Sequence, residues 1–285
     1  MKLILRKVDS ATSLLLFIYG FKRRFKKETN EELKLSSILN TMKLFGKNDS
    51  AVRMALSRAV KSGFFKNSRK ENQVYYSPTT EGKRFIIAYE KETDSFLKRL
   101  RLRNSQWDKT WYLLNLVRAN VLNTDKKKKF DQSLQLFGLI QISSNIWISP
   151  YDISDEISSL GDEFEIPDMT LMLHGEMTIS GDLKEFLCKI LKIDDFNKTY
   201  RDFISHYGEK LNLLESSYNK EHFIKNEIAI PLFYELGLTF LNFAFSDPLL
   251  PKEILPEWEG DRAAAILLGL MEKLMPSVEN YFKQI

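Results

Sequence analysis

Residues 48–63 read NDSAVRMALSRAVKSG, and this stretch decides how the first part of the chain is interpreted. It predicts a helix over about Ser50–Ser62, because Asn48 or Asp49 can cap its start and Gly63 ends it. Apolar residues recur at helical spacing and predict a buried stripe of Val52, Ala55, Leu56, Ala59 and Val60. The opposite face is polar and basic, and it carries Ser50, Arg53, Met54, Ser57, Arg58 and Lys61.

The helices and strands expected on either side of this helix follow one another in the order of a known structural motif. They are helices over about Ser10–Phe25 and Ser36–Phe45 before it, strands Phe64–Asn67 and Gln73–Ser77 around the polar stretch Ser68–Asn72 after it, and a long helix from about Glu81 to Arg103. Two helices followed by a hairpin are typical of a winged helix-turn-helix, whose second helix enters the major groove of DNA.

The residue types on the polar face suit contact with duplex DNA. Arginine reads guanine through two parallel hydrogen bonds, and serine bonds either a base or a phosphate. The hairpin adds Lys66, Arg69 and Lys70 for phosphate or minor-groove contact, and Lys22–Lys27 form a second basic cluster. The alternative is a solvated helix face held by salt bridges.

The distribution of charge favours the DNA-binding interpretation. The 285 residues carry a net charge of only +4. Residues 1–103, however, hold 24 Lys and Arg against 10 Asp and Glu, a net of +14, whereas residues 104–285 hold 18 against 28, a net of −10. The basic part suits a polyanion, and the acidic part suits regulation, dimerisation or a small ligand.

A different pattern follows Trp107. The expected elements are strand Trp111–Val117, helix Asp125–Phe137, strands Leu139–Ile142 and Asn145–Ser149, helix Ile153–Leu160 and strand Met169–His174. Strands interleaved with two helices in this order predict a ferredoxin-like α/β sandwich.

From Asp182 onward only helices are expected. They cover about Leu183–Leu191, Phe196–Leu214, Glu221–Ala244 and Arg262–Lys283, with Pro231 and Pro276 expected to kink or interrupt the last two. The fold class is therefore α+β, with a DNA-binding domain at residues 1–103, a ferredoxin-like domain at 104–180 and an all-α domain for regulation or dimerisation at 181–285.

Several classes of protein are disfavoured. Cys188 is the single cysteine, which excludes a disulfide framework. No apolar run reaches the ~18–20 residues of a membrane helix, and Leu14–Ile18 lacks a signal cleavage site, so we expect a cytoplasmic protein. No glycine-rich phosphate loop occurs, and the histidines show no metal-ligand spacing: His174, His206 and His222. We therefore expect no cofactor, no metal and no enzymatic activity.

The stretch Asn48–Gly63 resembles the helix-turn-helix signature of the PaaX family of bacterial transcriptional repressors. The resemblance continues in order along nearly the whole chain, through VYYSPTTEGKR (Val74–Arg84), WDKTWYLLNL (Trp107–Leu116), LFGLIQISSNIWISPYD (Leu136–Asp152), YRDFISHY (Tyr200–Tyr207) and FAFSDPLLPKEILPEWEGDRA (Phe243–Ala263). It implies a winged-helix domain, a ferredoxin-like domain and a helical domain. It also implies a homodimer that leaves its DNA operator on binding an aryl-acetyl-coenzyme A, typically phenylacetyl-coenzyme A.

The chain departs from the family in two ways. It is rich in lysine where relatives often carry arginine, and Met54 stands on the recognition face where smaller residues are common. The operator sequence is therefore expected to differ. No motif encodes the coenzyme A site; Arg201 and Arg262 are the candidates for its phosphates, and both equally suit surface ion pairs.

Other functions were weighed against the repressor. The middle domain also resembles CRISPR-associated metal-dependent ribonucleases, which need an Asp at the end of the first strand. Here Arg118, Ala119 and Asn120 follow that strand, so nuclease activity is disfavoured. A regulator answering to another small acid or thioester and a protein-interaction module remain open. Four tryptophans suit a ligand pocket but more often belong to a core: Trp107, Trp111, Trp147 and Trp258.

Overall fold

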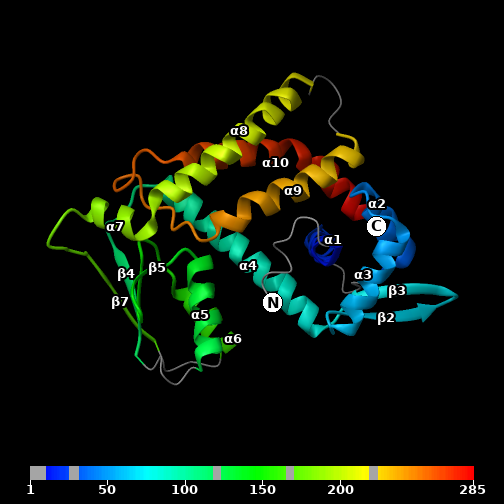
Figure 1. Ribbon diagram of the computed structural model, residues 1–285, viewed down its shortest axis with the longest axis horizontal. Helices are drawn as coiled ribbons and strands as arrows, with labels where there is room; N and C mark the ends of the chain where they lie inside the picture. Colours follow the sequence, from blue (N-terminus) through cyan, green and yellow to red (C-terminus); the bar gives the residue numbers. More distant parts are fainter. Residues whose placement is uncertain (1–10, 26–31, 118–122, 165–169, 218–223) are drawn as a thin grey trace. The chain divides into compact units, whose positions relative to one another are not determined.

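The computed structural model describes residues 11–25, 32–117, 123–164, 170–217 and 224–285 (Figure 1). Several residues used above lie outside them: Ser10, Lys26, Lys27, Arg118–Asn120, Met169, Glu221 and His222. The chain forms two compact units, each made of separate segments. The first unit contains 1–90, 206–242 and 264–285, and the second contains 91–205 and 243–263. The division into domains at 1–103, 104–180 and 181–285 stays a prediction.

The N-terminal part of the first unit holds the expected helices and hairpin, together with one extra strand. The elements are α1 (Ala11–Phe25), β1 (Leu33–Lys34), α2 (Leu35–Leu44), α3 (Asp49–Lys61), β2 (Phe65–Lys70), β3 (Gln73–Pro78) and the first part of α4 (Thr80–Arg103). The sheet has the order β1-β3-β2, with both neighbouring pairs antiparallel. The strand β1 was not expected, because two residues are too few to show an alternating pattern.

The hairpin is tighter than the sequence suggested. Ser68–Asn72 was expected to be a loop, but β2 continues to Lys70, which pairs with Gln73. Only Glu71 and Asn72 form the turn, with φ of 47° and 62°. Two successive residues in the left-handed region match the type I′ turn, whose twist fits a two-residue hairpin. The expectation of a long loop was therefore wrong, and the basic residues before Glu71 lie on a strand.

Helix α1 packs on one side against this sheet. The ring of Tyr19 lies 4.9 Å from that of Phe65, and its hydroxyl donates to the carbonyl of Tyr76 at 2.7 Å. Buried residues lie around most of the helix, including Leu14, Leu15, Leu16 and Ile18. A helix that is apolar on most sides needs a second partner besides the sheet.

The C-terminal helices supply that partner. Phe17 lies 4.8 Å from Tyr234 on α9 (Asn226–Ala244) and 5.8 Å from Phe282 on α10 (Glu259–Gln284), between ring centroids. Phe21 lies 5.2 Å from Phe233 and 5.7 Å from Phe282. We call these five side chains the aromatic cluster. The core of the first unit is therefore built from segments more than 200 positions apart in the sequence.

Both C-terminal prolines lie inside continuous helices, so of the two expected outcomes, a kink or an interruption, the interruption does not occur. Pro231 is in the second turn of α9. Because proline has no amide hydrogen, the helix loses one backbone hydrogen bond, to a carbonyl of its first turn. Pro276 is flanked by Leu274 and Val278, which are fully buried and hold that part of α10 by packing. Among the described helices, α9 alone is long and apolar enough to cross a membrane; half of that window is buried in the fold, as in an ordinary core helix.

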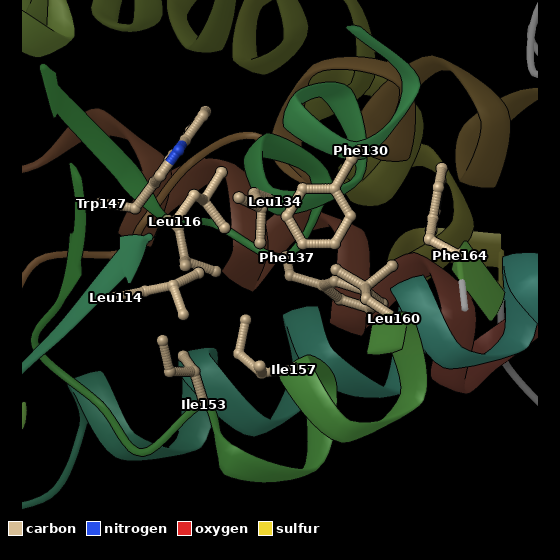
Figure 2. Close-up of a cluster of buried hydrophobic side chains, with 11 residues drawn as sticks. Leu114, Leu116, Phe130, Leu134, Phe137, Trp147, Ile153, Ile157, Leu160 and Phe164 are labelled. Carbon is tan, nitrogen blue, oxygen red and sulfur yellow. The ribbon is translucent and has the colours of Figure 1, made fainter. Parts of the chain in front are cut away.

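The second unit contains a four-stranded antiparallel sheet of order β5-β6-β4-β7. Its elements are β4 (Trp111–Leu116), α5 (Thr124–Leu136), β5 (Ile140–Ser143), β6 (Ile146–Ser149), α6 (Ser154–Phe164) and β7 (Thr170–Gly175). This β-α-β-β-α-β connectivity is that of a ferredoxin-like sandwich. Figure 2 shows its core, where Leu114, Leu116 and Trp147 from the sheet meet side chains of α5 and α6. Trp147 is a core residue and is fully buried.

The rest of the second unit is helical or extended: α7 (Leu183–Leu191), the first part of α8 (Ile193–Ser217), the end of α4 and the connector 245–258. Arg103 on α4 is fully buried, and its guanidinium donates to both carboxylate oxygens of Asp261 at 2.7 Å. It also donates to the carbonyls of Leu250 and Leu255. Arg103 thus joins α4 to the connector through two main-chain carbonyls and to the first turn of α10 through Asp261.

A second buried arginine lies one turn earlier on α4. Arg99 donates to the carbonyls of Phe137 at 2.7 Å and Phe245 at 2.8 Å, and burial lowers its pKa to about 10. Asp247 accepts from the Tyr200 hydroxyl at 2.5 Å and from Trp258 Nε1 at 3.0 Å, and burial raises its pKa. We call the buried residues Arg99, Arg103, Tyr200 and Asp247, together with Asp261, whose side chain is 29% exposed, the buried ionic network.

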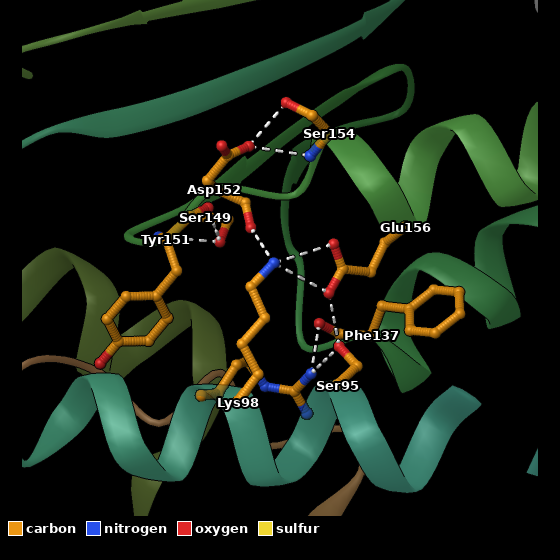
Figure 3. A network of polar contacts seen from close by, with 9 residues as sticks. Ser95, Lys98, Phe137, Ser149, Tyr151, Asp152, Ser154 and Glu156 are labelled. Carbon is orange, nitrogen blue, oxygen red and sulfur yellow. Dashed lines mark hydrogen bonds and ion pairs between the residues drawn. The ribbon is translucent and has the colours of Figure 1, made fainter. Parts of the chain in front are cut away.

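Polar side chains also connect α4 to α6 (Figure 3). Ser95 donates to Glu156 at 3.0 Å. The Lys98 ammonium reaches the same carboxylate at 3.4 Å and the carbonyl of Asp152 at 2.9 Å. The last part of α4 is therefore held both by the sandwich and by the connector.

Candidate nucleic-acid interface

Helix α3 forms because its ends and its inner face are all specified locally. Asn48 caps it, with its side-chain oxygen accepting from the amide of Ala51 at 2.8 Å. Gly63 follows the helix with φ +77°, a left-handed value that favours glycine. The predicted stripe faces inward, since Val52, Ala55, Leu56 and Ala59 are buried, while Val60 is half-buried. The stretch that predicted the helix therefore also fixes its orientation.

The outer face of α3 carries all six predicted contact residues, and each is exposed: Ser50, Arg53, Met54, Ser57, Arg58 and Lys61. Met54 has 57% of its surface exposed. Arg53, Arg58 and Lys61 form no ion pair with any residue that the structure describes. The salt-bridged alternative therefore lacks its acidic partners within that part of the chain.

The three predicted contact residues of the hairpin do not all lie on the same face of their strand. Lys66, Arg69 and Lys70 are all exposed on β2. Because side chains alternate along a strand, Lys66 and Lys70 lie on one face and Arg69 on the other. Lys70 forms an ion pair with Glu32, and its ammonium lies 5.6 Å from the centroid of the Tyr75 ring.

Sequence reasoning missed Glu32, which is 38 positions before Lys70. Its side chain also accepts from the hydroxyl of Ser68 at 3.2 Å. The bonds from Lys70 and Ser68 lower the pKa of the Glu32 carboxyl. Its proximity depends on the pairing of β1 with β3, and a two-residue strand leaves no periodic signal that could have revealed it.

The second basic cluster is only partly available to a partner. Lys22 is buried, and its ammonium donates to the carbonyl of Glu32 at 2.7 Å. Arg23 lies 4.0 Å from Glu90. Arg24 is exposed, and Lys26 and Lys27 lie outside the described residues. Lys22 is therefore a structural residue, contrary to the expectation that it belongs to a second basic cluster for DNA contact.

The arginines considered for coenzyme A and the four tryptophans all lie in the second unit. Arg201 and Arg262 both reach the carboxylate of Glu259, at 4.0 and 3.4 Å, as surface ion pairs. Trp111 and Trp258 are buried, and Trp107 stacks edge-on against Trp111 at 5.6 Å. These contacts favour structural roles for the tryptophans, as for Trp147.

The described histidines contact protein side chains. His174 stacks on Tyr112 at 5.8 Å, and His206 lies 3.9 Å from Glu235. Within the residues that the structure describes, no three His, Cys, Asp or Glu side chains are grouped as metal ligands would be. The residues after β4 that bear on the nuclease alternative, Arg118–Asn120, are not among them.

Comparison with known proteins gives matches along nearly the whole chain. Residues 10–82 match the family model described as "PaaX-like protein", residues 104–186 match "PaaX protein central Cas2-like domain", and residues 191–284 match "PaaX-like protein C-terminal domain". The central match agrees with the ferredoxin-like connectivity of the second unit.

Two individual proteins are similar over most of their length. The transcriptional repressor PaaX of Escherichia coli (strain K12) is 23% identical over 278 residues, which cover 94% of this chain and 81% of the relative. The solved structure of the uncharacterized protein Rv0674 from Mycobacterium tuberculosis is 13% identical, with a TM-score of 0.49 over 87% of this chain and 89% of that one.

The three family models match in the order in which the quoted motifs occur along the sequence. The curated relative extends over the same segments. The chain belongs to the PaaX family.

Proposed function

We propose that the chain is a DNA-binding transcriptional repressor whose N-terminal part is a winged helix-turn-helix. Helix α3 is the reading helix, and β2 and β3 form the wing. The observation that carries this proposal is the outer face of α3, where Arg53 and Arg58 are exposed without acidic partners among the described residues. The name of the Escherichia coli relative, a transcriptional repressor, supports the same role.

The proposal includes the assembly and the compartment. One helix-turn-helix covers one half-site, so a homodimer would bind two half-sites about one helical turn apart, or a multiple of it. The protein would act in the cytoplasm, without a catalytic step of its own.

The experiment that tests DNA binding is selection of duplexes from a random pool, followed by titration of variants on the selected sequence. Arg53→Ala or Arg58→Ala should each weaken binding by about tenfold or more if the side chain contacts a base. Replacement of Lys43, which is exposed on α2 and paired with Asp49, is the control. Full affinity in both arginine variants would reject α3 as the reading helix.

We further propose that the regulated genes serve phenylacetate catabolism and that an aryl-acetyl-coenzyme A releases the protein from DNA. A ligand shifts an equilibrium only by its differential affinity for the two states, and the linkage is reciprocal. The acidic part of the chain, residues 104–285, is the proposed location of the effector site.

The effector is tested by gel-shift titration with phenylacetyl-coenzyme A, phenylacetate and free coenzyme A. Release by the thioester alone is expected, because its nucleotide and phosphates provide most of the polar contacts. Release by the free acid, or by none of the three, would reject this effector in favour of another small acid or thioester. Either result would leave the proposal of DNA binding intact.

A further inference from the structure

An acid outside the wing faces one of the wing's lysines. Glu32 immediately precedes β1, whose residues Leu33 and Lys34 pair with Tyr76 and Tyr75 of β3. From there its side chain extends across β3 to β2. One carboxylate oxygen accepts from Ser68 Oγ at 3.2 Å, and the other accepts from the ammonium of Lys70.

The position of this carboxylate is well defined. The carbonyl of Glu32 accepts from the buried Lys22 ammonium at 2.7 Å, and the pairing of Leu33 with Tyr76 fixes the next residue. The Glu32 side chain is 21% exposed, compared with 56% for Lys70. The acid is therefore held against the sheet, whereas the lysine extends into solvent.

The two groups are charged together at neutral pH. Lys70 lowers the pKa of Glu32, and Glu32 raises the pKa of Lys70. Lys66, on the same face of β2, adds to the field that lowers the pKa of Glu32. Among the described residues no such acid faces Arg69, on the other side of the strand.

We propose that Glu32 sets the affinity of the protein for DNA by competing with backbone phosphate for Lys70. The inference rests on the proposed function, because it requires the wing to contact DNA. A phosphate that approaches Lys70 must displace a carboxylate that is already bonded to it. The displaced carboxylate then stays close to the phosphate, and like charges repel.

The cost falls on the phosphate contacts, which are shared by binding to every sequence. Phosphate contacts supply nearly all of non-specific affinity, whereas base contacts from α3 supply discrimination. An acid that weakens one phosphate contact lowers affinity for all sequences but preserves base reading. Glu32 thereby limits occupation of random genomic DNA without changing which sequence is preferred.

The variant that isolates this role is Glu32→Gln. Glutamine has nearly the same shape; its one carbonyl oxygen can accept from Lys70, and its NH2 group can donate to the Ser68 hydroxyl, so the wing stays supported while the charge is lost. Glu81→Gln is the matched control, because Glu81 is an exposed acid of the same unit whose ion pair is with Arg84. Both variants change the net charge equally.

Affinity is measured on the selected duplex and on a random-sequence duplex at several salt concentrations. Glu32→Gln should bind the random duplex about two- to fivefold more tightly than wild type, the range expected for loss of one exposed ion pair. The salt dependence should steepen by up to about one unit, since one more phosphate is neutralised. Glu81→Gln should differ little from wild type.

A double-mutant cycle with Lys70→Met assigns the effect to the pair. In the Lys70→Met background, Glu32→Gln should give no further gain. A gain of the same size there would overturn the proposal, as would unchanged or weaker binding by Glu32→Gln alone. Weaker binding together with a lower Tm would make Glu32 a support for the hairpin. If the wild-type chain binds neither duplex, the proposed function itself fails.

Discussion

The aromatic cluster and the buried ionic network both join distant parts of the sequence, but by opposite chemistry. In the first unit, Phe17 and Phe21 of α1 pack against rings of α9 and α10. In the second unit, Arg99 and Arg103 of α4 are bonded to carbonyls and carboxylates around the connector. Hydrophobic burial of the rings is non-directional, whereas each bond of the network has a fixed donor and acceptor.

This difference determines how each cluster responds to change. Removing one ring leaves a cavity that neighbours can partly fill. Removing one ion leaves its partners desolvated and unpaired, which no repacking repairs. The ionic network is therefore the more sensitive of the two, and the first unit, which holds the elements proposed to contact DNA, has the more adaptable core.

The largest loss of stability is expected for Arg103→Met. This variant keeps the bulk of the side chain but leaves the carbonyls of Leu250 and Leu255 without their donor, for a loss of about 4 kcal/mol in the free energy of unfolding. Urea denaturation measures it. Arg101→Met, at an exposed position of the same helix, should stay within about 0.5 kcal/mol of wild type. A loss below about 1 kcal/mol for Arg103→Met would show that the network is not essential.

Phe282→Ala should cost about 3 kcal/mol, because the ring is fully buried and contacts both Phe17 and Phe21. Denaturation of this variant is compared with Leu268→Ala, which changes an exposed residue of the same helix. Phe282→Leu should recover part of the loss, since the neighbouring rings can repack around it. Equal losses for leucine and alanine would contradict the adaptable behaviour of the cluster.

Asp247→Asn should cost about 2 kcal/mol. Asp247 accepts from Tyr200, Trp258 and the amide of Leu249. An amide retains only one acceptor oxygen, so one of these donors would face an NH2 group. Chemical denaturation gives the loss, and Asp155→Asn, an exposed acid on α6, is the control. Stability equal to wild type would mean that Asp247 is not needed in its ionised, accepting form.

The smallest effect is expected at the hydroxyl pair beside the aromatic cluster. Tyr281 and Thr41 share a hydrogen bond of 2.8 Å, and Thr41 also donates to the carbonyl of Ser37. Tyr281→Phe should lower stability by about 1 kcal/mol, because the threonine keeps its second partner. Thermal unfolding of Tyr281→Phe, Thr41→Val and the double variant measures the coupling. A coupling of zero would show that the hydrogen bond adds nothing to the ring contacts.

Local signals in the sequence were sufficient for most helices and strands. The apolar stripe and Asn48 cap of α3 lie within one short segment, so periodicity alone predicted which face would be outward. The same holds for the sandwich, where β4 and β6 are apolar and the turns between elements carry glycine or asparagine. The predicted contact residues on α3 are all exposed for this reason, although their binding role stays a prediction.

What the sequence could not provide were partners that depend on tertiary structure. The apolar residues of α1 showed that it would be buried, but not that Phe282 would cover it. Arg99 and Arg103 were indistinguishable from the other basic residues of the first 103 positions, because burial of an ion is set by distant carbonyls. The role of Glu32 could not be predicted for the same reason. Its partners Ser68 and Lys70 lie on β2, and its side chain reaches them only because β1 pairs with β3.

The aromatic cluster also bears on the timing of protein synthesis. Phe17 and Phe21 are translated long before their partner Phe282, and at about 5–20 residues per second the interval is on the order of ten to fifty seconds. During this time α3 can form on the ribosome while one side of α1 is still uncovered. The proposed DNA-binding part would therefore have its complete core, and with it full DNA affinity, only after α10 has been made. A nonsense mutation before α10 should give a chain that cannot occupy its operator, and so a recessive loss of repression.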